Sequence, residues 1–170
     1  MARSDPPLRD ATPEEMRALG HPLRLRILRL TLEQALSNKQ LAERLGRDPG
    51  TVLHHVRVLE RRGFLRAEPE RSGRRGARER PYRATGKSWQ VRMAPSAGHT
   101  VTVMEAVRDE IAEAGPDSIV STMRLGVRLS AQDLAALKAR IAEIGDEFAV
   151  RDDPAGEAVG ILALVHRRRR

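Results

Sequence analysis

The side chains best suited to specific chemistry in this chain lie between residues 48 and 62. Val52, Val56 and Leu59 recur at spacings of four and three, which predicts a helix with one buried face. The other face and the start of this helix carry groups that can hydrogen-bond or pack against base edges in a DNA groove. We expect base contacts from five positions: Pro49, Gly50, Leu53, His54 and Arg57.

A second group of residues is suited to phosphate rather than to bases. Ser37, Lys39 and Gln40 stand at the start of an earlier helix, and Thr51 stands at the start of the helix just described. Because free backbone N–H groups at helix N-termini favour anions, we expect these four residues to meet the DNA backbone. For His55 the sequence leaves two interpretations open, a core residue or a further phosphate contact.

The segment from residue 71 to 83 is strongly basic. It contains six Arg residues and the single acid Glu79, for a net charge of +5. A loop with this self-repulsion is poorly explained by folding alone and well explained by phosphate binding. We expect four of its arginines to reach phosphates or a narrow minor groove: Arg74, Arg75, Arg78 and Arg80.

Local signals place these residues on two short helices joined by a tight turn. Ser37 and Gln40 form a capping box for the first helix, and Gly46 suits the left-handed conformation that ends it. Asp48 then caps the second helix, which has Pro49 at its first position and stops before Gly63.

Two short β-type runs follow, at 64–67 and 81–85, on either side of the basic loop. Together with the two helices they predict a winged helix-turn-helix, in which the second helix enters a major groove. A purely structural helical hairpin is the alternative for the helix pair alone. It leaves the charge of the loop unexplained.

Residues 16–85 resemble the winged helix-turn-helix of the ArsR/SmtB-type bacterial transcription regulators. The resemblance is carried by AlaLeuGlyHisProLeuArgLeuArgIleLeu at 18–28, by ThrValLeuHisHisValArgValLeu at 51–59, and by the hairpin after Gly63. It implies a dimeric DNA-binding regulator, usually a repressor that a signal releases. Short terminal helices make the dimer in the minimal members of that family, and this chain departs from them after residue 88.

Upstream of this region the sequence predicts two further helices. Thr12 and Glu15 form a capping box for a helix at about 13–19, and Pro22 starts the next one. His21 between them is better explained as a cap or packing residue than as a metal ligand. No Asp, Cys or second His sits at metal-ligand spacing from it.

Charge divides the chain into two halves. Residues 1–88 carry a net charge of +9, and residues 89–170 a net charge of −1. This asymmetry predicts an N-terminal half that faces DNA, followed by a C-terminal half with a different function. We therefore expect an α+β protein with a disordered N-terminal tail at 1–10, a winged helix-turn-helix at 11–88, a small α/β domain at 89–166 and a basic tail at 167–170.

The second half has its own pattern. A short strand at 89–93 and a helix at 100–114 are followed by residues 119–129, whose alternating side chains predict a strand with one buried face. A helix at 131–148, capped by Ser130, precedes a final apolar strand at 158–166. We expect this domain to dimerise. Its apolar interior is also compatible with a small-molecule effector, which the sequence does not identify.

Several classes of function are excluded by what the sequence lacks. It has no nucleophile elbow, phosphate loop, paired catalytic carboxylate motif or His cluster, so we expect no enzyme activity, catalytic residue, cofactor or metal. The absence of Cys removes disulfides and thiolate metal sites. No apolar run approaches 18 residues and no signal pattern precedes the helices, so we expect no membrane contact and a cytoplasmic location.

These observations indicate a regulator, most simply a repressor, that binds double-stranded DNA as a homodimer on a palindromic operator. Two alternatives remain open from the sequence. One is a nucleic-acid-associated accessory module without a specific operator. The other is a ligand- or metal-sensing member of the same family.

Overall fold

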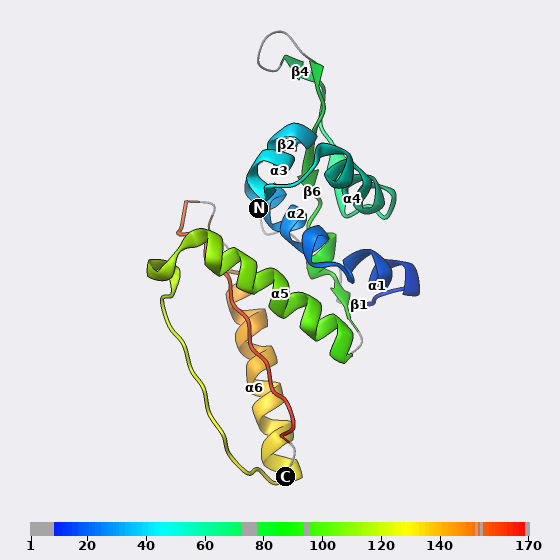
Figure 1. The fold of residues 1–170 in the computed structure, drawn as a ribbon. Helices are drawn as coiled ribbons and strands as arrows, with labels where there is room; N and C mark the ends of the chain where they lie inside the picture. The colour runs from blue at the N-terminus through cyan, green and yellow to red at the C-terminus, as the bar shows by residue number, and fades with distance from the viewer. Residues whose placement is uncertain (1–8, 73–77, 94–95, 152, 154, 169–170) are drawn as a thin grey trace. The chain divides into compact units, whose positions relative to one another are not determined.

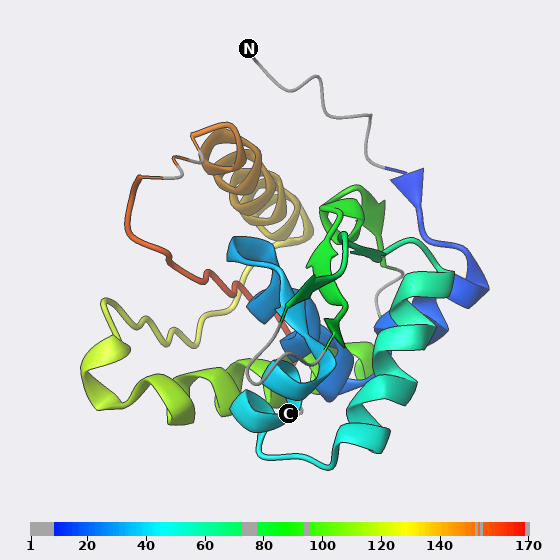
Figure 2. The ribbon, with the colours of Figure 1, turned by 90° about the horizontal axis from the view of Figure 1, so that it is seen from above.

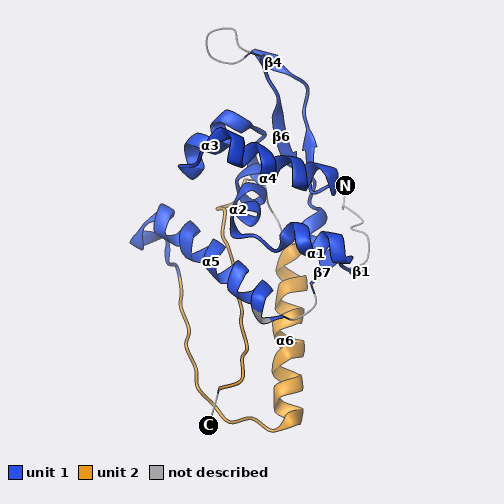
Figure 3. Ribbon diagram, turned by 45° about the vertical axis from the view of Figure 1, so that its right-hand side comes forward, with its two compact units in different colours: residues 1–120 blue, residues 121–170 orange. Residues whose placement is uncertain are grey.

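The computed structural model describes the chain except for residues 1–8, 73–77, 94–95, 152, 154 and 169–170. It divides into two compact units, Met1–Val120 and Ser121–Arg170, which Figure 3 shows in separate colours. No described helix is both long enough and apolar enough to cross a membrane. Each unit is described by itself below.

The helices of the first unit begin where the capping signals predict. They are α1 (Pro13–Leu19), α2 (Pro22–Glu33), α3 (Asn38–Leu45) and α4 (Pro49–Arg61), followed later by α5 (Ala97–Ala114). Both predicted capping boxes are formed, by Thr12 with Glu15 and by Ser37 with Gln40. His21 caps α2, because its Nδ1 accepts a hydrogen bond from the Leu23 N–H at 3.2 Å.

A small antiparallel sheet follows α4. Its order is β2 (Leu36–Ser37), β6 (Pro81–Ala84) and β3 (Leu65–Ala67), with Tyr82 of β6 opposite Leu36 on one side and Ala67 on the other. Between β3 and β6 the chain forms a second ladder from β4 (Arg71–Ser72) and β5 (Arg78–Glu79), which extends away from the helices in Figure 1. This hairpin is the wing, so the winged helix-turn-helix is confirmed.

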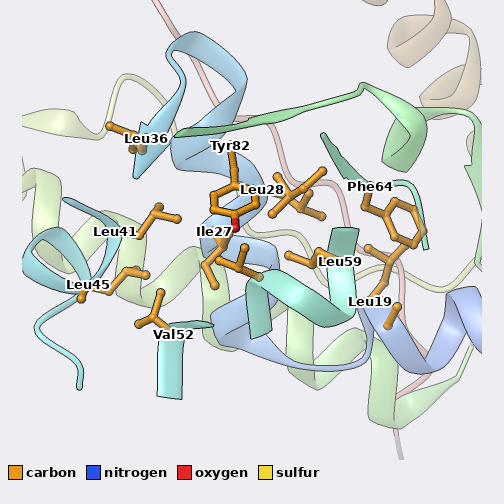
Figure 4. Close-up of a cluster of buried hydrophobic side chains, with 14 of the residues drawn as sticks. Leu19, Ile27, Leu28, Leu36, Leu41, Leu45, Val52, Leu59, Phe64 and Tyr82 are labelled. Atoms are coloured by element: carbon orange, nitrogen blue, oxygen red, sulfur yellow. The ribbon is translucent and has the colours of Figure 1, made fainter. Parts of the chain in front are cut away.

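One hydrophobic core joins α1 to α4 and the sheet. Figure 4 shows its buried side chains, including Ile27 from α2, Leu41 from α3 and Phe64 after α4. The predicted apolar face of α4 lies in this core, since Val52 and Leu59 have no exposed surface. Leu, Ile and Val side chains of this size each contribute roughly 1.5–3 kcal/mol on burial.

Helix α5 packs against α2 within the first unit, as Figure 1 and Figure 2 show. Arg26 of α2 has a side chain only 13% exposed, and it forms ion pairs with Glu113 and, at 3.9 Å, with Asp109 of α5. The helix begins at Ala97, three residues before the position that its apolar spacing indicates, because Ser96 caps it through the His99 N–H.

The second unit contains one long helix, α6 (Ala131–Ala149), whose N-cap is Ser130 as predicted. The strands expected at 119–129 and 158–166 were wrong for the described chain: those residues form neither helix nor strand. The alternation of side chains is present, but a strand also needs a neighbouring backbone to bond, and local sequence does not specify that neighbour. The mixed helix-and-sheet class is confirmed, with the sheets in the first unit.

The expected boundaries at 88 and 166 remain predictions. Residues 1–8 of the expected N-terminal tail lie outside the described residues, but its last two residues are ordered as a strand. β1 (Arg9–Asp10) pairs in parallel with β7 (Val91–Arg92), which follows the short 3-10 turn η2 (Lys87–Trp89). A second such turn, η3 (Pro116–Ser118), follows α5.

A buried carboxylate fastens this ordered segment to α1. The Glu15 side chain, 6% exposed, lies 2.7 Å from Nη2 of Arg9 and 2.8 Å from Nζ of Lys87. Lys87 also donates to the Arg62 carbonyl at 2.6 Å, just beyond the end of α4. The hydrogen bond from Arg9 holds the pKa of Glu15 well below its usual range, although burial opposes this shift.

We expect Glu15→Gln to lower the free energy of unfolding by about 2 kcal/mol, because two cations lose their shared anion. The folded pKa of Glu15 lies below the unfolded one, so this contribution is present at neutral pH and lost on acidification. Urea denaturation at neutral and acidic pH measures both effects. Glu14→Gln, on the same helix but more exposed, is the control. An unchanged midpoint in Glu15→Gln would contradict the assignment.

Candidate nucleic-acid interface

Three local devices fix the start of α4. Asp48 caps it, accepting from the Thr51 N–H at 2.9 Å, and Pro49 occupies the first turn. Gly46, at φ +58°, ends α3 in the left-handed region predicted for it. Asn38 donates its side-chain amide to the Pro49 carbonyl at 2.9 Å and so ties α3 to α4 across the turn. Nothing in the local sequence points to this role of Asn38 except its place beside the Ser37 cap.

The exposed face of α4 carries the side chains selected for base contact. Pro49, Gly50, His54 and Arg57 are exposed, and Leu53 is half-buried. Thr51, selected for phosphate contact, is exposed at the same end. The face therefore combines backbone groups of a helix N-terminus with an imidazole and a guanidinium, a set that can hydrogen-bond to base edges and phosphates.

His55 lies on the inner side of α4. It is 8% exposed, and its ring packs 4.4 Å from that of His21 between centroids. Its Nδ1 lies 3.3 Å from Nη1 of Arg24, which also donates to the carbonyls of Ala18 and Arg17. Because a guanidinium can only donate, Nδ1 of His55 is the acceptor and the ring is neutral. Of the two interpretations, burial favours the core residue.

The three residues expected to meet phosphate at the start of α3 differ in how far their side chains are already engaged in hydrogen bonds within the protein. The Ser37 hydroxyl is buried and caps the helix, so it is occupied by the backbone. Lys39 is exposed and has its ammonium available. Gln40 completes the capping box through Oε1, and the same oxygen accepts from Nη2 of Arg71 at 2.9 Å.

The described basic side chains of the wing contact different partners. Arg78 is 87% exposed in its side chain and lies 3.5 Å from Glu70. Arg80 pairs with Glu60 of α4 at 3.2 Å, and its guanidinium lies 5.9 Å from the Tyr82 ring centroid. Arg74 and Arg75 lie outside the described residues.

Arg71 was counted in the charge of the loop but was not expected to contact DNA. Its hydrogen bond to Gln40 links the wing to α3.

The described residues hold no group of three or more His, Cys, Asp or Glu side chains arranged to bind a metal ion. His21, His54 and His55 are neighbours, with the last two rings 5.5 Å apart. Arg24 faces this histidine group, and a fixed positive charge disfavours a cation there.

Comparison with known proteins supports the local architecture. A family model described as a helix-turn-helix domain matches residues 19–68, which run from the end of α1 to just beyond β3. No match was found among curated proteins. The first unit thus contains a helix-turn-helix domain completed by a wing.

Solved structures of low similarity also align with the chain. Reduced HlyU from Vibrio cholerae is 20% identical, covers 54% of this chain and 80% of its own, and has a TM-score of 0.36. The transcriptional regulator Tm0710 from Thermotoga maritima is 24% identical, covering 79% and 83%, with a TM-score of 0.37. Lactococcus lactis ZitR in complex with DNA is 17% identical, covering 87% and 80%, with a TM-score of 0.36.

The burial of His55 predicts a pH-dependent stability. Desolvation, the neighbouring His21 and Arg24, and His54 lower the pKa of His55 to about 4. Between pH ~6.5 and ~4 the unfolded chain therefore binds more protons at this site, and stability falls as pH falls. We expect this site to contribute a loss on the order of 3 kcal/mol across that window.

Thermal or urea denaturation of the native chain and of His55→Gln, from pH 7 to pH 4, measures this contribution. The variant should show a shallower dependence on pH. His166→Gln, which replaces an exposed histidine of the second unit, is the control. Equal pH slopes for the native chain and His55→Gln would refute the assignment of a neutral core histidine.

Proposed function

We propose that the chain is a DNA-binding transcription regulator of the ArsR/SmtB type, which acts as a repressor and binds a palindromic operator as a homodimer. The observation that carries this proposal is the exposed polar face of α4, held outward by a fully buried apolar face and preceded by a capped turn. A helix needing only a structural role would not require a basic wing beside it.

In this arrangement α4 lies in the major groove. His54 and Arg57 point to base edges, with Leu53 available to pack on a thymine methyl, and the N-terminal turn at Pro49 and Gly50 approaches closely because it carries no long side chain. Lys39, Thr51 and the backbone around Ser37 and Gln40 hold phosphates. The wing arginines extend the contact along the backbone or into the adjacent minor groove.

A homodimer follows from the small size of one reading surface. A single helix-turn-helix contacts few bases, and two copies related by a two-fold axis read two half-sites about one helical turn apart. The part of the chain after residue 88 is the proposed source of this pairing. A small-molecule effector that weakens DNA binding is compatible with repression, but no described residue identifies its chemistry.

The first test is base discrimination by His54 and Arg57. Replacing either by Ala should cost about 1–3 kcal/mol of specific binding and relax the base preference at one position of each half-site. Fluorescence anisotropy on a selected operator, and on the same duplex scrambled, measures the effect. Arg62→Ala, an exposed change just after α4, is the control.

An equal loss on operator and scrambled duplex would contradict base reading by these residues. Chromatin profiling then distinguishes the regulator from an accessory module, because discrete palindromic peaks support the first and even genomic coverage supports the second.

The second test concerns the wing. Changing Arg74, Arg75, Arg78 and Arg80 together to Gln should weaken binding to every sequence and flatten its salt dependence, by roughly 0.9 in log–log slope per lost phosphate contact. Stability should hardly change, or rise, because the substitutions relieve like-charge repulsion within the wing. A matched variant carries four Gln substitutions at Arg17, Arg62, Arg140 and Arg151, all of them exposed and outside the wing. An unchanged salt slope in the wing variant would remove the wing from the DNA contact.

A further inference from the structure

An extended segment of the second unit is left without a partner. Residues 121–129 form neither helix nor strand, and no described backbone pairs with them in a ladder. Apolar side chains nevertheless alternate along most of this segment, and Met123 and Leu125 are 88% and 72% exposed. Extended backbone with unpaired N–H and C=O groups and an exposed apolar row is the arrangement that associates with another strand.

The other extended segment of the same unit does not pair with residues 121–129. Residues 158–166 are also exposed and unpaired. Where the two approach, a hollow of about 330 Å³ is lined by Arg124, Leu125, Gly126, His166 and Arg168. The Arg168 guanidinium occupies the space over Gly126, where an added Cβ would lie 3.0 Å from its Nη1. The two segments therefore meet through side chains and are not joined by backbone hydrogen bonds.

Pairing with a second copy restricts the register. Two identical strands related by a two-fold axis run antiparallel, and opposite residues must share a face, so the apolar odd-numbered positions must meet each other. A two-fold axis at residue 124 places Arg124 of one copy opposite Arg124 of the other. An axis at residue 126 places Arg124 of one copy opposite Arg128 of the other. Both registers bring like charges together and are unfavourable.

An axis at Leu125 avoids both clashes. It places Arg124 opposite Gly126 and Arg128 opposite Thr122, while Met123 meets Val127. It is also the register in which all nine residues of the segment find partners. Gly126 has no side chain of its own to meet the partner's Arg124, and the Arg168 guanidinium that lies over Gly126 within one protomer has to turn aside for it.

We propose that residues 121–129 of two copies pair as antiparallel strands about a two-fold axis at Leu125, forming an intersubunit sheet. This inference rests on the proposed homodimer and specifies how the two copies meet. The segment and residues 158–166 together supply eighteen exposed extended residues per copy. Nine of these residues, those of the segment itself, take part in the proposed pairing, fewer than the roughly 20–30 residues that each partner contributes to a stable interface, so the paired strands form one part of the contact between the two copies.

The chain contains no Cys, so single cysteines report the register directly. In the full-length protein, Leu125→Cys places two thiols directly opposite one another, where Cα atoms lie about 4.5–5.5 Å apart and a disulfide can form. Mild oxidation of a dilute solution should shift most of this variant to a dimer on non-reducing gels, and a reductant should reverse the shift.

Met123→Cys is the matched control on the same face. In the proposed register its two copies lie four residues apart, about 13 Å along the strands, and should not cross-link. Lys138→Cys, exposed on α6, controls for random collision. Cross-linking of Met123→Cys in preference to Leu125→Cys, equal cross-linking of all three variants, or none at all would overturn the pairing.

The same samples separate this inference from the proposed function. If Leu125→Cys cross-links selectively but the protein binds no duplex DNA, the pairing stands and the regulator assignment fails. If the protein binds duplex DNA and Leu125→Cys does not cross-link, the regulator assignment stands and this pairing fails.

Discussion

The apolar face of α4 packs into the core formed with α2, α3 and β3, and every feature that DNA would meet depends on this packing. Val52, Val56 and Leu59 have no exposed surface. Because a helix turns once every 3.6 residues, burying these three positions turns His54 and Arg57 outward. The same burial fixes the angle between α3 and α4, which the bond from Asn38 to the Pro49 carbonyl then locks.

Charged groups hold the edges of this core rather than its centre. Glu15 joins Arg9 and Lys87, and Lys87 donates to the Arg62 carbonyl just after α4. Arg24 joins the end of α1 to His55 on the inner side of α4. A buried charge is tolerated only when it is paired and hydrogen-bonded, so each of these contacts ties two or more elements together. Helix α4 is thereby fixed at its inner face and at its C-terminal end.

The starts of α1 to α4, with their caps and the turn between α3 and α4, could be predicted because each depends on a few adjacent residues. Ser37 with Gln40, Gly46, and Asp48 with Pro49 all behave as their local chemistry requires. Four of the five positions expected to contact bases are exposed on α4 and Leu53 is half-buried, while their contact with DNA stays a prediction. Periodicity left His55 ambiguous. Its burial depends on Arg24 and His21, which lie more than thirty residues earlier, and no local pattern identifies such partners.

The sequence by itself determined the helices, their capped ends, the alternation along residues 121–129 and the excess positive charge of the wing. These are properties of neighbouring residues, and short-range sterics and hydrogen bonding decide them. Only the tertiary structure decided that Arg9 and Asp10 join a strand, that Gln40 binds Arg71, and that the two extended segments of the second unit remain unpaired. Alternation selects a face but not a partner, because a β-ladder is formed between backbones that the order of residues alone does not bring together.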